Sequence, residues 1–304
     1  MRKLLYINFI IKNIHKSRSL LESIPHAILN ILRGNKEHRL LLPHPTILPI
    51  TPPNLLALID VWGHLRLKEV DYRSKRLIWE LAPEVHIATQ TEQGLDIVAL
   101  AEVFIGRPYG SNFKDMRVLD IGGYKGESAI FFALNGAASV ACIEPSPVAA
   151  EHILENIALS GFENRIKYYP VAIGSERGTQ SFFITAEEAS GSSLFPTLRA
   201  SNLSYRTAEV PVYTLEDILE ELGWSEADFA KVDCEGCEYM IFASTPTETL
   251  RRVKVWAIET HRGTPSIVET LRKAGYEVAS WEEPDELGLV RAWLPGAPCP
   301  WAPC

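Results

Sequence analysis

The sequence predicts an α/β protein built on a doubly wound, mostly parallel sheet. From residue 117 onward, short apolar strand-like runs alternate with amphipathic helical patterns, as in parallel sheets covered by helices on both faces. A glycine-rich turn follows the run at 118–121 and precedes a helical pattern. Two closing strand-like runs, 276–281 and 287–293, have no helix between them, which indicates one antiparallel strand.

The N-terminal segment differs from the rest in charge and pattern. Residues 1–45 hold eight Lys or Arg against two Glu, and apolar residues at helical spacing predict helices over 1–34. A basic membrane-surface anchor is one interpretation. We favour a helical extension that packs on the main domain or on a partner subunit, because Pro25 and Gly34 break the segment into short pieces. The expected organisation is a helical extension, a linker with lead-in elements, the main domain and an extended tail, at 1–45, 46–113, 114–295 and 296–304.

The remaining elements follow in chain order. Three apolar segments without a chemical motif occupy the lead-in, and Pro170 suits the third strand of the main domain to a sheet edge. The expected lead-in segments are 77–81, 85–88 and 97–104; the strands are 118–121, 139–143, 166–171, 182–184, 210–213, 229–232, 255–259, 276–281 and 287–293; the helices are 127–135, 146–160, 215–222, 239 onward and 266–274.

The composition excludes several classes of protein. Of 304 residues, 46% are hydrophobic and 22% charged, the proportions of a folded globular protein. Thirty basic against 38 acidic residues give a net charge of −8, which argues against a general nucleic-acid binder. No apolar run approaches the roughly 20 residues that span a bilayer. We find no signal-peptide pattern and only five cysteines, so we expect a cytoplasmic protein.

The strongest chemical signal is VLDIGGYKGES at 118–128. Asp120 ends a buried strand, and Gly122, Gly123 and Gly126 form a turn that a ligand can approach closely. Glu144 ends the next strand, 22 residues after Gly122, where a carboxylate can accept both hydroxyls of an adenosine ribose. A dinucleotide site needs G-x-G-x-x-G, and Asp120 would repel a pyrophosphate but attract an ammonium. The charge pattern therefore favours S-adenosylmethionine, and a purely structural glycine turn is the alternative.

Four stretches of the chain resemble the FkbM-like family of S-adenosylmethionine-dependent methyltransferases. They are VLDIGGYKGES, IEPSP with the following helix and Asn156, VAIGSERG and FAKVDCEGCEY, and the resemblance covers about 100–293. It implies a seven-stranded, Rossmann-like class I methyltransferase fold, methylation of a hydroxyl, and cofactor contacts from Asp120, Gly122 and Glu144. The sequence departs from the usual pattern at Gly123, Cys234 and Cys237. The candidate cofactor residues are Asp120, Gly122, Gly123, Gly126, Glu144, Pro145, Ala172 and Asp233.

A second group of acidic residues follows the later strands. Asp233 and Glu235 come after one strand and His261 closes the next, so the topology brings them to the sheet edge that carries Asp120. The candidate catalytic residues are Asp233, His261 and Glu235, with Asp233 or His261 as the base that removes a hydroxyl proton. A structural histidine is the alternative for His261, and a helix first-turn charge is the alternative for Glu238. A divalent metal on Asp233, Glu235 and His261 is a weaker hypothesis, and no metal is predicted.

The cysteines allow two interpretations. Cys234-x-x-Cys237 with Cys299-x₄-Cys304 has ligands for a four-thiolate zinc site, but 61 residues separate the pairs. Cys234 and Cys237 also lie inside the strand motif that carries the family resemblance. We therefore expect small buried thiols and a disordered tail.

The polar stretch 185–205 is the candidate acceptor lid. Ser192, Ser193 and Arg199, with Glu238 beside them, are the candidate substrate-binding residues, and a mobile surface loop is the alternative. The expected acceptor is a hydroxyl on a small molecule, a sugar or a lipid-linked compound. Two other functions stay open at this point: an NAD-dependent oxidoreductase on a similar sheet, and an inactive cofactor-binding scaffold.

Overall fold

The computed structural model describes residues 38–41, 47–50, 57, 61, 64–71, 73–90, 95–185, 192–194, 205–282 and 287–301. The helices predicted over 1–34 lie outside these residues. The chain forms two compact units, Met1–Pro108 and Tyr109–Cys304.

The first unit contains two small antiparallel sheets. Strand β1 (His38–Leu41) lies in the segment predicted as a helical extension and pairs with β2 (Ile47–Ile50), which lies in the predicted linker. Pro49 is tolerated because both strands of a two-stranded sheet are edges. Strands β3 (Arg66–Asp71), β4 (Arg76–Ala82) and β5 (Val85–Gln90) form a meander, followed by helix α4 (Leu95–Ala101) and a π-helical turn, η2 (Glu102–Gly106). The buried Trp79 indole donates to Thr89 Oγ1 at 2.9 Å, so its polar atom is satisfied inside this sheet.

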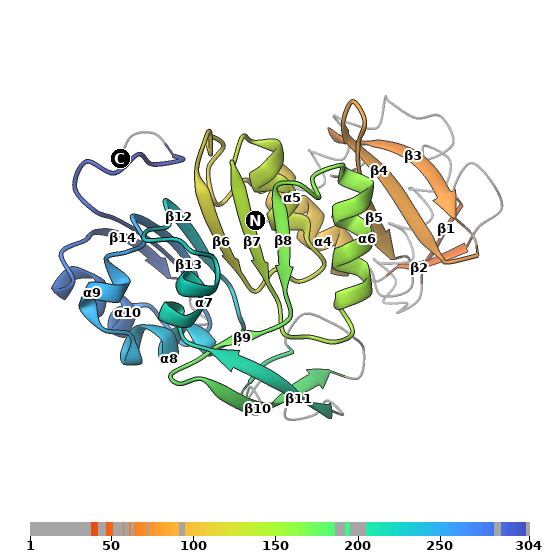
Figure 1. Ribbon diagram of the computed structural model, residues 1–304. Helices are drawn as coiled ribbons and strands as arrows, with labels where there is room; N and C mark the ends of the chain where they lie inside the picture. The colour runs from red at the N-terminus through yellow and green to blue at the C-terminus, as the bar shows by residue number, and fades with distance from the viewer. Residues whose placement is uncertain are drawn as a thin grey trace. The chain divides into compact units, whose positions relative to one another are not determined.

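The second unit is built on the predicted doubly wound sheet. Its seven strands have the order β14-β15-β13-β12-β6-β7-β8 (Figure 1). Strand β15 is antiparallel to both neighbours and the other pairings are parallel, which confirms the prediction. The bounds are β6 (Arg117–Ile121), β7 (Ser139–Ile143), β8 (Ile166–Tyr169), β12 (Phe229–Val232), β13 (Val255–Thr260), β14 (Glu277–Glu282) and β15 (Gly288–Trp293). As predicted, the strand before Pro170 is an edge strand.

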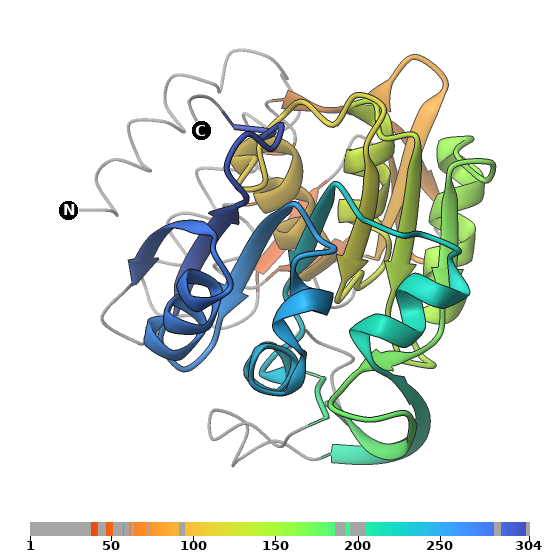
Figure 2. The same ribbon diagram turned by 60° about the vertical axis from the view of Figure 1, so that its left-hand side comes forward.

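Helices cover both faces of this sheet (Figures 1 and 2). Helix α5 (Glu127–Leu134) packs Phe132 on Phe229 of β12, and α6 (Ala150–Ser160) lies beside α5. The opposite face buries Ile121 and Ile143 against α7 (Leu215–Glu221), α8 (Cys237–Ser244) and α10 (Pro265–Lys273). A short helix, α9 (Thr247–Leu250), follows α8. Helix α6 begins four residues after the predicted start, because Ser146 to Ala149 form a turn, and α8 begins two residues earlier than predicted.

The polar insertion contains longer strands than the sequence predicted. Strands β9 (Ala172–Ile173), β10 (Gly178–Thr185) and β11 (Tyr205–Tyr213) form a separate sheet of order β10-β11-β9. Every second side chain, such as Phe182, Ile184, Val210 and Val212, enters a small core of its own, while the intervening residues, such as Phe183 and Pro211, are more exposed.

The C-terminal segment is packed, at least up to Trp301, and the expectation of a disordered tail is wrong there. The Trp301 ring lies 5.9 Å from that of Phe229, and the Arg291 guanidinium lies 4.8 Å from its centre. The Pro300 carbonyl accepts the Ser111 N–H at 3.0 Å. An aromatic residue near the end of the chain thus fixes the tail through packing and a cation–π contact.

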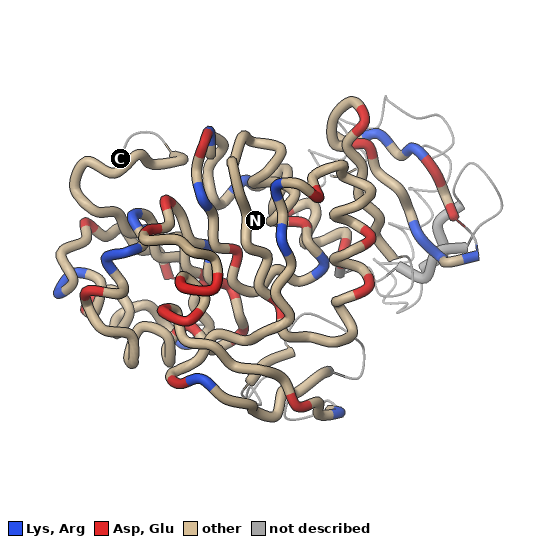
Figure 3. Tube along the Cα trace, viewed as in Figure 1, with Lys and Arg blue, Asp and Glu red and all other residues tan. Residues whose placement is uncertain are grey.

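The charges of the second unit are mixed. Lys and Arg are scattered among Asp and Glu along the described trace (Figure 3). Within the described residues, no helix has the length and apolar character needed to cross a membrane.

Candidate functional site

Four parallel strands end at one edge of the sheet, and the candidate residues follow directly after them. Gly122 follows β6, Glu144 follows β7, Asp233 follows β12 and His261 follows β13. Because parallel strands have their carboxyl ends at the same edge, segments more than 100 residues apart in sequence converge there, as predicted.

The glycine turn after β6 is closely packed. Gly122 has a φ of +80°, and a Cβ placed on it would lie 1.8 Å from the Asp233 carbonyl oxygen. A Cβ on Gly123 would lie 2.5 Å from Cys142 Sγ, which explains a glycine at this departure from the family pattern. Gly126, with a φ of +94°, starts helix α5. The first two glycines therefore let β6, β7 and β12 end in contact with one another.

Glu144 is buried at the end of β7 with its carboxylate held by two backbone groups. Tyr124 N–H donates to Oε2 at 3.2 Å and Ser146 N–H donates to Oε1 at 2.9 Å. Burial raises the pKa of the Glu144 carboxyl to about 7, although both N–H groups favour the ionised form. Each oxygen keeps a lone pair for a further donor.

Asp120 has a cation partner that the sequence analysis missed. Its side chain is fully buried, Ser128 Oγ donates to Oδ2 at 2.7 Å, and Lys231 Nζ lies 3.3 Å from Oδ1. Lys231, on β12, is itself only 3% exposed. Burial raises the pKa of Asp120, and the nearby lysine opposes that rise. Burial disfavours the charged lysine, yet Asp120 and Asp233 hold the pKa of Lys231 above its ordinary value.

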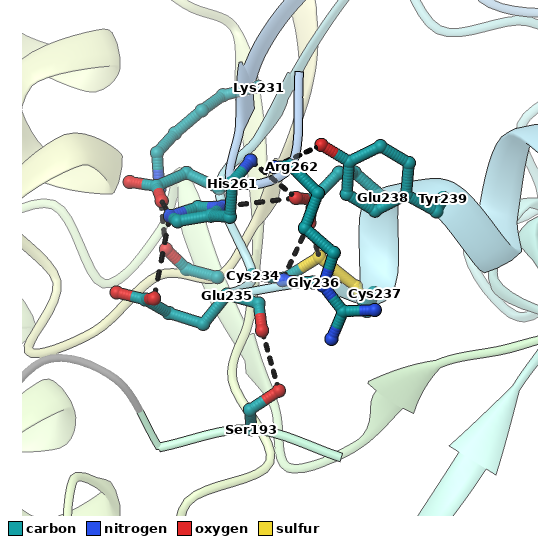
Figure 4. Close-up of polar contacts among 12 residues, drawn as sticks. Ser193, Lys231, Cys234, Glu235, Gly236, Cys237, Glu238, Tyr239, His261 and Arg262 are labelled. Carbon is teal, nitrogen blue, oxygen red and sulfur yellow. Dashed lines mark hydrogen bonds and ion pairs between the residues drawn. A yellow bond between two sulfur atoms is a disulfide. The ribbon is translucent and has the colours of Figure 1, made fainter. Parts of the chain in front are cut away.

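His261 lies at the centre of the acidic group (Figure 4). Its Nδ1 is 3.0 Å from Oε1 of Glu238, a fully buried carboxylate that also accepts the His261 backbone N–H. Its Nε2 is 3.4 Å from Glu235 Oε2 and 4.0 Å from Asp233 Oδ1. Burial lowers the pKa of His261, but the Glu238 hydrogen bond and the three carboxylates raise it further, to about 9. The imidazole is therefore oriented by Glu238 and presents Nε2 to the other acids.

Glu259 joins Asp233 and His261 more closely than the sequence analysis foresaw. One potential ligand atom from each of these three lies within 4.8 Å of the others. The metal hypothesis considered from sequence used Glu235 in place of Glu259. The protonated imidazole already balances these carboxylates, and a metal ion would have to displace its proton.

The cysteines contradict the expectation of buried thiols. Cys234 and Cys237 form a disulfide, with their Cα atoms 5.5 Å apart, and Cys299 is disulfide-bonded as well. Among the described residues the buried Cys142 is a free thiol. The four cysteines of the zinc alternative are thus not available as a thiolate set, because two of them are bonded to each other.

The structure places some of the other candidate residues near the site and others away from it. Pro145 directly follows Glu144 and is half-buried, whereas the Ala172 side chain lies in the core of the insertion sheet. Ser193 donates to the Glu235 carbonyl at 2.6 Å, which joins the insertion to the acidic group. Ser192 is described next to it, and Arg199 lies outside the described residues.

Comparison with protein families identifies the reaction class of the site at this edge of the sheet. Residues 120–278, more than half of the chain, match the model of the methyltransferase FkbM domain. This chain belongs to the FkbM methyltransferase family. The match spans all four strand ends, confirms the resemblance seen in the sequence, and favours methyl transfer over an NAD-dependent oxidoreductase. The FkbM protein is an S-adenosylmethionine-dependent methyltransferase with that molecule as its cofactor.

Other comparisons add little for this FkbM protein. Comparison with curated protein sequences gave no match. A protein of the NADB-Rossmann superfamily from Streptococcus agalactiae is 14% identical over 60% of this chain and 63% of its own, with a TM-score of 0.36. Precorrin-6y C5,15-methyltransferase from Geobacter metallireducens is 16% identical over 67% of this chain and 89% of its own, with a TM-score of 0.36. The METTL16 methyltransferase domain is 14% identical over 80% of this chain and 79% of its own, with a TM-score of 0.43. These values are too low to carry an argument about substrate.

Proposed function

We propose that the protein transfers a methyl group from S-adenosylmethionine to a hydroxyl group, on a small molecule, a sugar or a lipid-linked acceptor, in the cytoplasm. The observation that carries this proposal is the Glu238–His261 pair. A buried carboxylate holds Nδ1 at 3.0 Å and so orients the ring. As the pH approaches the His261 pKa of about 9, the imidazole loses its Nε2 proton, and the Nε2 lone pair can then accept a proton at the edge where the glycine turn lies. A hydroxyl needs such a group, because its proton must leave as the new bond forms.

The residues at the glycine turn fit the cofactor. Glu144 keeps one lone pair on each oxygen for the two ribose hydroxyls after its backbone bonds are made. Gly122 and Gly126 leave the turn without side chains that would cover it, and Pro145 lies beside Glu144. Asp120 acts through Lys231 and Ser128 to fix the end of β6. When bound, S-adenosylmethionine supplies an electrophilic methyl group on a sulfonium.

In this proposal the residues near the acceptor have two roles, proton removal and acceptor binding. Neutral His261 takes the hydroxyl proton at Nε2, and Glu238 stabilises the imidazolium that results. Asp233 and Glu235 flank Nε2 and accept hydrogen bonds from other hydroxyls of the acceptor. Alignment of the acceptor with the methyl group contributes on the order of 7–11 kcal/mol to lowering the barrier.

The acceptor class is tested by labelling. Extract fractions of small molecules, glycans and lipids are incubated with the protein and methyl-labelled S-adenosylmethionine, and products are analysed by mass spectrometry. We expect label in an ether of a former hydroxyl. Label found only on nitrogen, or only on carbon, would contradict the proposal of O-methylation while leaving the family assignment intact. Cofactor binding without any labelled product would favour the inactive scaffold.

Cofactor affinity should depend on the ionisation of Glu144. Because burial places its pKa near 7 and ribose hydroxyls need the ionised form, lowering the pH from 8 to 6 should weaken S-adenosylhomocysteine binding about tenfold. Calorimetry in two buffers of different ionisation enthalpy should also detect proton release on binding at pH 6. In Glu144→Gln both effects should be absent. A pH-independent affinity in the unmodified protein would remove Glu144 from the cofactor site.

The raised pKa of Glu144 also affects the stability of the protein without cofactor, but there a higher pH is unfavourable. The folded protein keeps the Glu144 proton up to about pH 7, whereas the unfolded chain releases it near 4.5. This group therefore lowers the free energy of unfolding as the pH rises through that window.

The insertion is proposed to hold the acceptor through Ser193. Replacing Ser193 by alanine removes its hydrogen bond to the Glu235 carbonyl, so methyl transfer should fall about five- to tenfold. Affinity for S-adenosylhomocysteine should stay within twofold, because the cofactor residues lie on other turns. Ser181→Ala, at an exposed serine on strand β10 of the same insertion, is the matched control. Equal activity of both variants would place acceptor binding elsewhere.

A further inference from the structure

A disulfide closes the loop that carries two acids of the site. Cys234 and Cys237 bracket Glu235 and Gly236, between the end of β12 and the first turn of α8. Figure 4 shows the sulfur–sulfur bond beside Glu238 and the Glu235 backbone. The ring so formed contains two residues between the cysteines, so its closure directly limits the conformations of Glu235 and Gly236.

Both bracketed residues have backbones in the left-handed region. Glu235 has a φ of +55° and Gly236 one of +113°. Glycine adopts such angles freely, whereas a residue with a side chain such as Glu235 stays there only when its surroundings hold it. In this conformation its carboxylate lies 3.4 Å from His261 Nε2, and its carbonyl accepts Ser193 Oγ. The disulfide is one covalent constraint on both contacts.

The two sulfurs differ in exposure and setting. Cys237 is 4% exposed and is the first residue of α8, where the helix N-terminus favours a thiolate. Cys234 is half-buried on the loop, so it is the sulfur that a reductant reaches. A partly exposed sulfur as the point of attack and a stabilised leaving thiolate are the arrangement of an exchangeable disulfide rather than an inert one.

We propose that the Cys234–Cys237 pair is a redox-modification site at which a dithiol reductant opens the disulfide and releases Glu235 from the acceptor side of the active site. The effect of this opening on methyl transfer rests on the proposed function. A thiolate of the dithiol attacks Cys234 Sγ, the bond between the two cysteines breaks, and Cys237 leaves as a thiolate and takes up a proton. The second thiol of the reductant then attacks the mixed disulfide. The protein gains two electrons and two protons, and the dithiol is oxidised to a disulfide.

Opening the ring should change the contacts of Glu235 with His261 and Ser193, which we assign to the acceptor. It should not change the cofactor residues that follow β6 and β7. Without the bond, Glu235 can leave the left-handed region, which moves its carboxylate from His261 and its carbonyl from Ser193. Among the described residues, no disulfide joins the segments of Gly122 and Glu144 to this loop, and Gly122 packs on the backbone of Asp233, which lies just outside the ring. In a compartment where glutathione and thioredoxin keep most thiols reduced, such a pair would respond to the local redox state.

The test compares the full-length protein after dithiothreitol with the same protein after oxidised glutathione. Alkylation and peptide mapping should find Cys234 and Cys237 free in the first sample and joined in the second. NMR titration of His261 should show a pKa lower by about 0.5–1 unit in the reduced sample, the effect of removing one carboxylate at this distance in a well-screened site. The double variant Cys234→Ser/Cys237→Ser should show the lower value under both conditions. Cys299→Ser, which removes a described cysteine that is disulfide-bonded outside this ring, should keep the full redox response.

Each contrary result overturns a specific statement. Two alkylated cysteines after oxidised glutathione, or a bond that resists dithiothreitol in the folded protein, would overturn the exchange step. An identical His261 pKa in both samples would overturn the release of Glu235. S-adenosylhomocysteine affinity is measured in both samples and should agree within twofold. If S-adenosylhomocysteine bound in neither sample, the proposed function would be refuted. The His261 titration tests the redox site independently of that result.

Discussion

Replacing Lys231 with methionine should lower the free energy of unfolding at pH 7.5 by about 3–5 kcal/mol, the usual effect of removing one partner from a buried ion pair. Lys231 Nζ lies 3.3 Å from the Asp120 carboxylate, and both side chains are at most 4% exposed. Without the lysine, a carboxylate stays in a site that water does not reach, so its pKa rises further. The loss should therefore be smaller at pH 5, where Asp120 takes up a proton more easily.

Urea denaturation of a double variant separates this pair from general packing. Asp120→Asn with Lys231→Met removes both charges, and it should be less destabilised than the sum of the single variants by at least about 1 kcal/mol. Lys273→Met is the matched control, because Lys273 forms an exposed pair with Glu269 that contributes at most about 1 kcal/mol. Additive single effects would show that Lys231 and Asp120 do not stabilise each other.

Replacing His261 with glutamine should slow methyl transfer by about 10²–10⁴-fold, the usual contribution of a positioned base. The rate is measured with the hydroxyl acceptor that the labelling experiment identifies, and affinity for S-adenosylhomocysteine should stay within twofold. His152→Gln, on α6, is the matched control and should keep the full rate. A rate within threefold of the unmodified protein would remove His261 from the reaction.

The pH profile distinguishes His261 from Asp233 as the base. Since the pKa of His261 is raised to about 9, kcat should rise about tenfold per unit between pH 6.5 and 8 and level off near 9. With Asp233 as the base, kcat would not follow the ionisation of His261, and Asp233→Asn would cause the larger loss. The raised pKa also stabilises the fold below about 6.5, and this contribution is lost as the pH rises through 9, so unfolding is checked at each pH.

The position of the site could be predicted from sequence because it depends on topology. Once strands and helices alternate, the residues that follow the parallel strands must lie at one edge of the sheet. The sequence pattern alone therefore places Gly122, Glu144, Asp233 and His261 together. Short, regular patterns of apolar residues predicted the order and type of the main-sheet elements, whereas the strands of the insertion and the starts of α6 and α8 differ from the predicted bounds. The family motifs then identified the cofactor.

The features that could not be predicted from the sequence depend on contacts between distant segments of the chain. Lys231 pairs with Asp120 only because β12 lies directly beside β6, and those residues are opposite each other in the sheet. The signal was a lysine within a four-residue strand that is otherwise apolar and has no solvent face. The docking of Trp301 likewise depends on Phe229 and Arg291. The cysteine pair had the right spacing for a disulfide, but its place inside a strand motif favoured the interpretation as packed thiols.

The most direct test of the whole account is calorimetric titration of the unmodified protein and of Glu144→Ala with S-adenosylhomocysteine and with NAD at pH 8. We expect one site for S-adenosylhomocysteine in the unmodified protein and no binding of NAD. Binding should be at least tenfold weaker in the folded variant, because charge-assisted hydrogen bonds of about 1.5–3 kcal/mol each are lost. Equal affinity in both proteins, or binding of NAD in place of S-adenosylhomocysteine, would contradict the account.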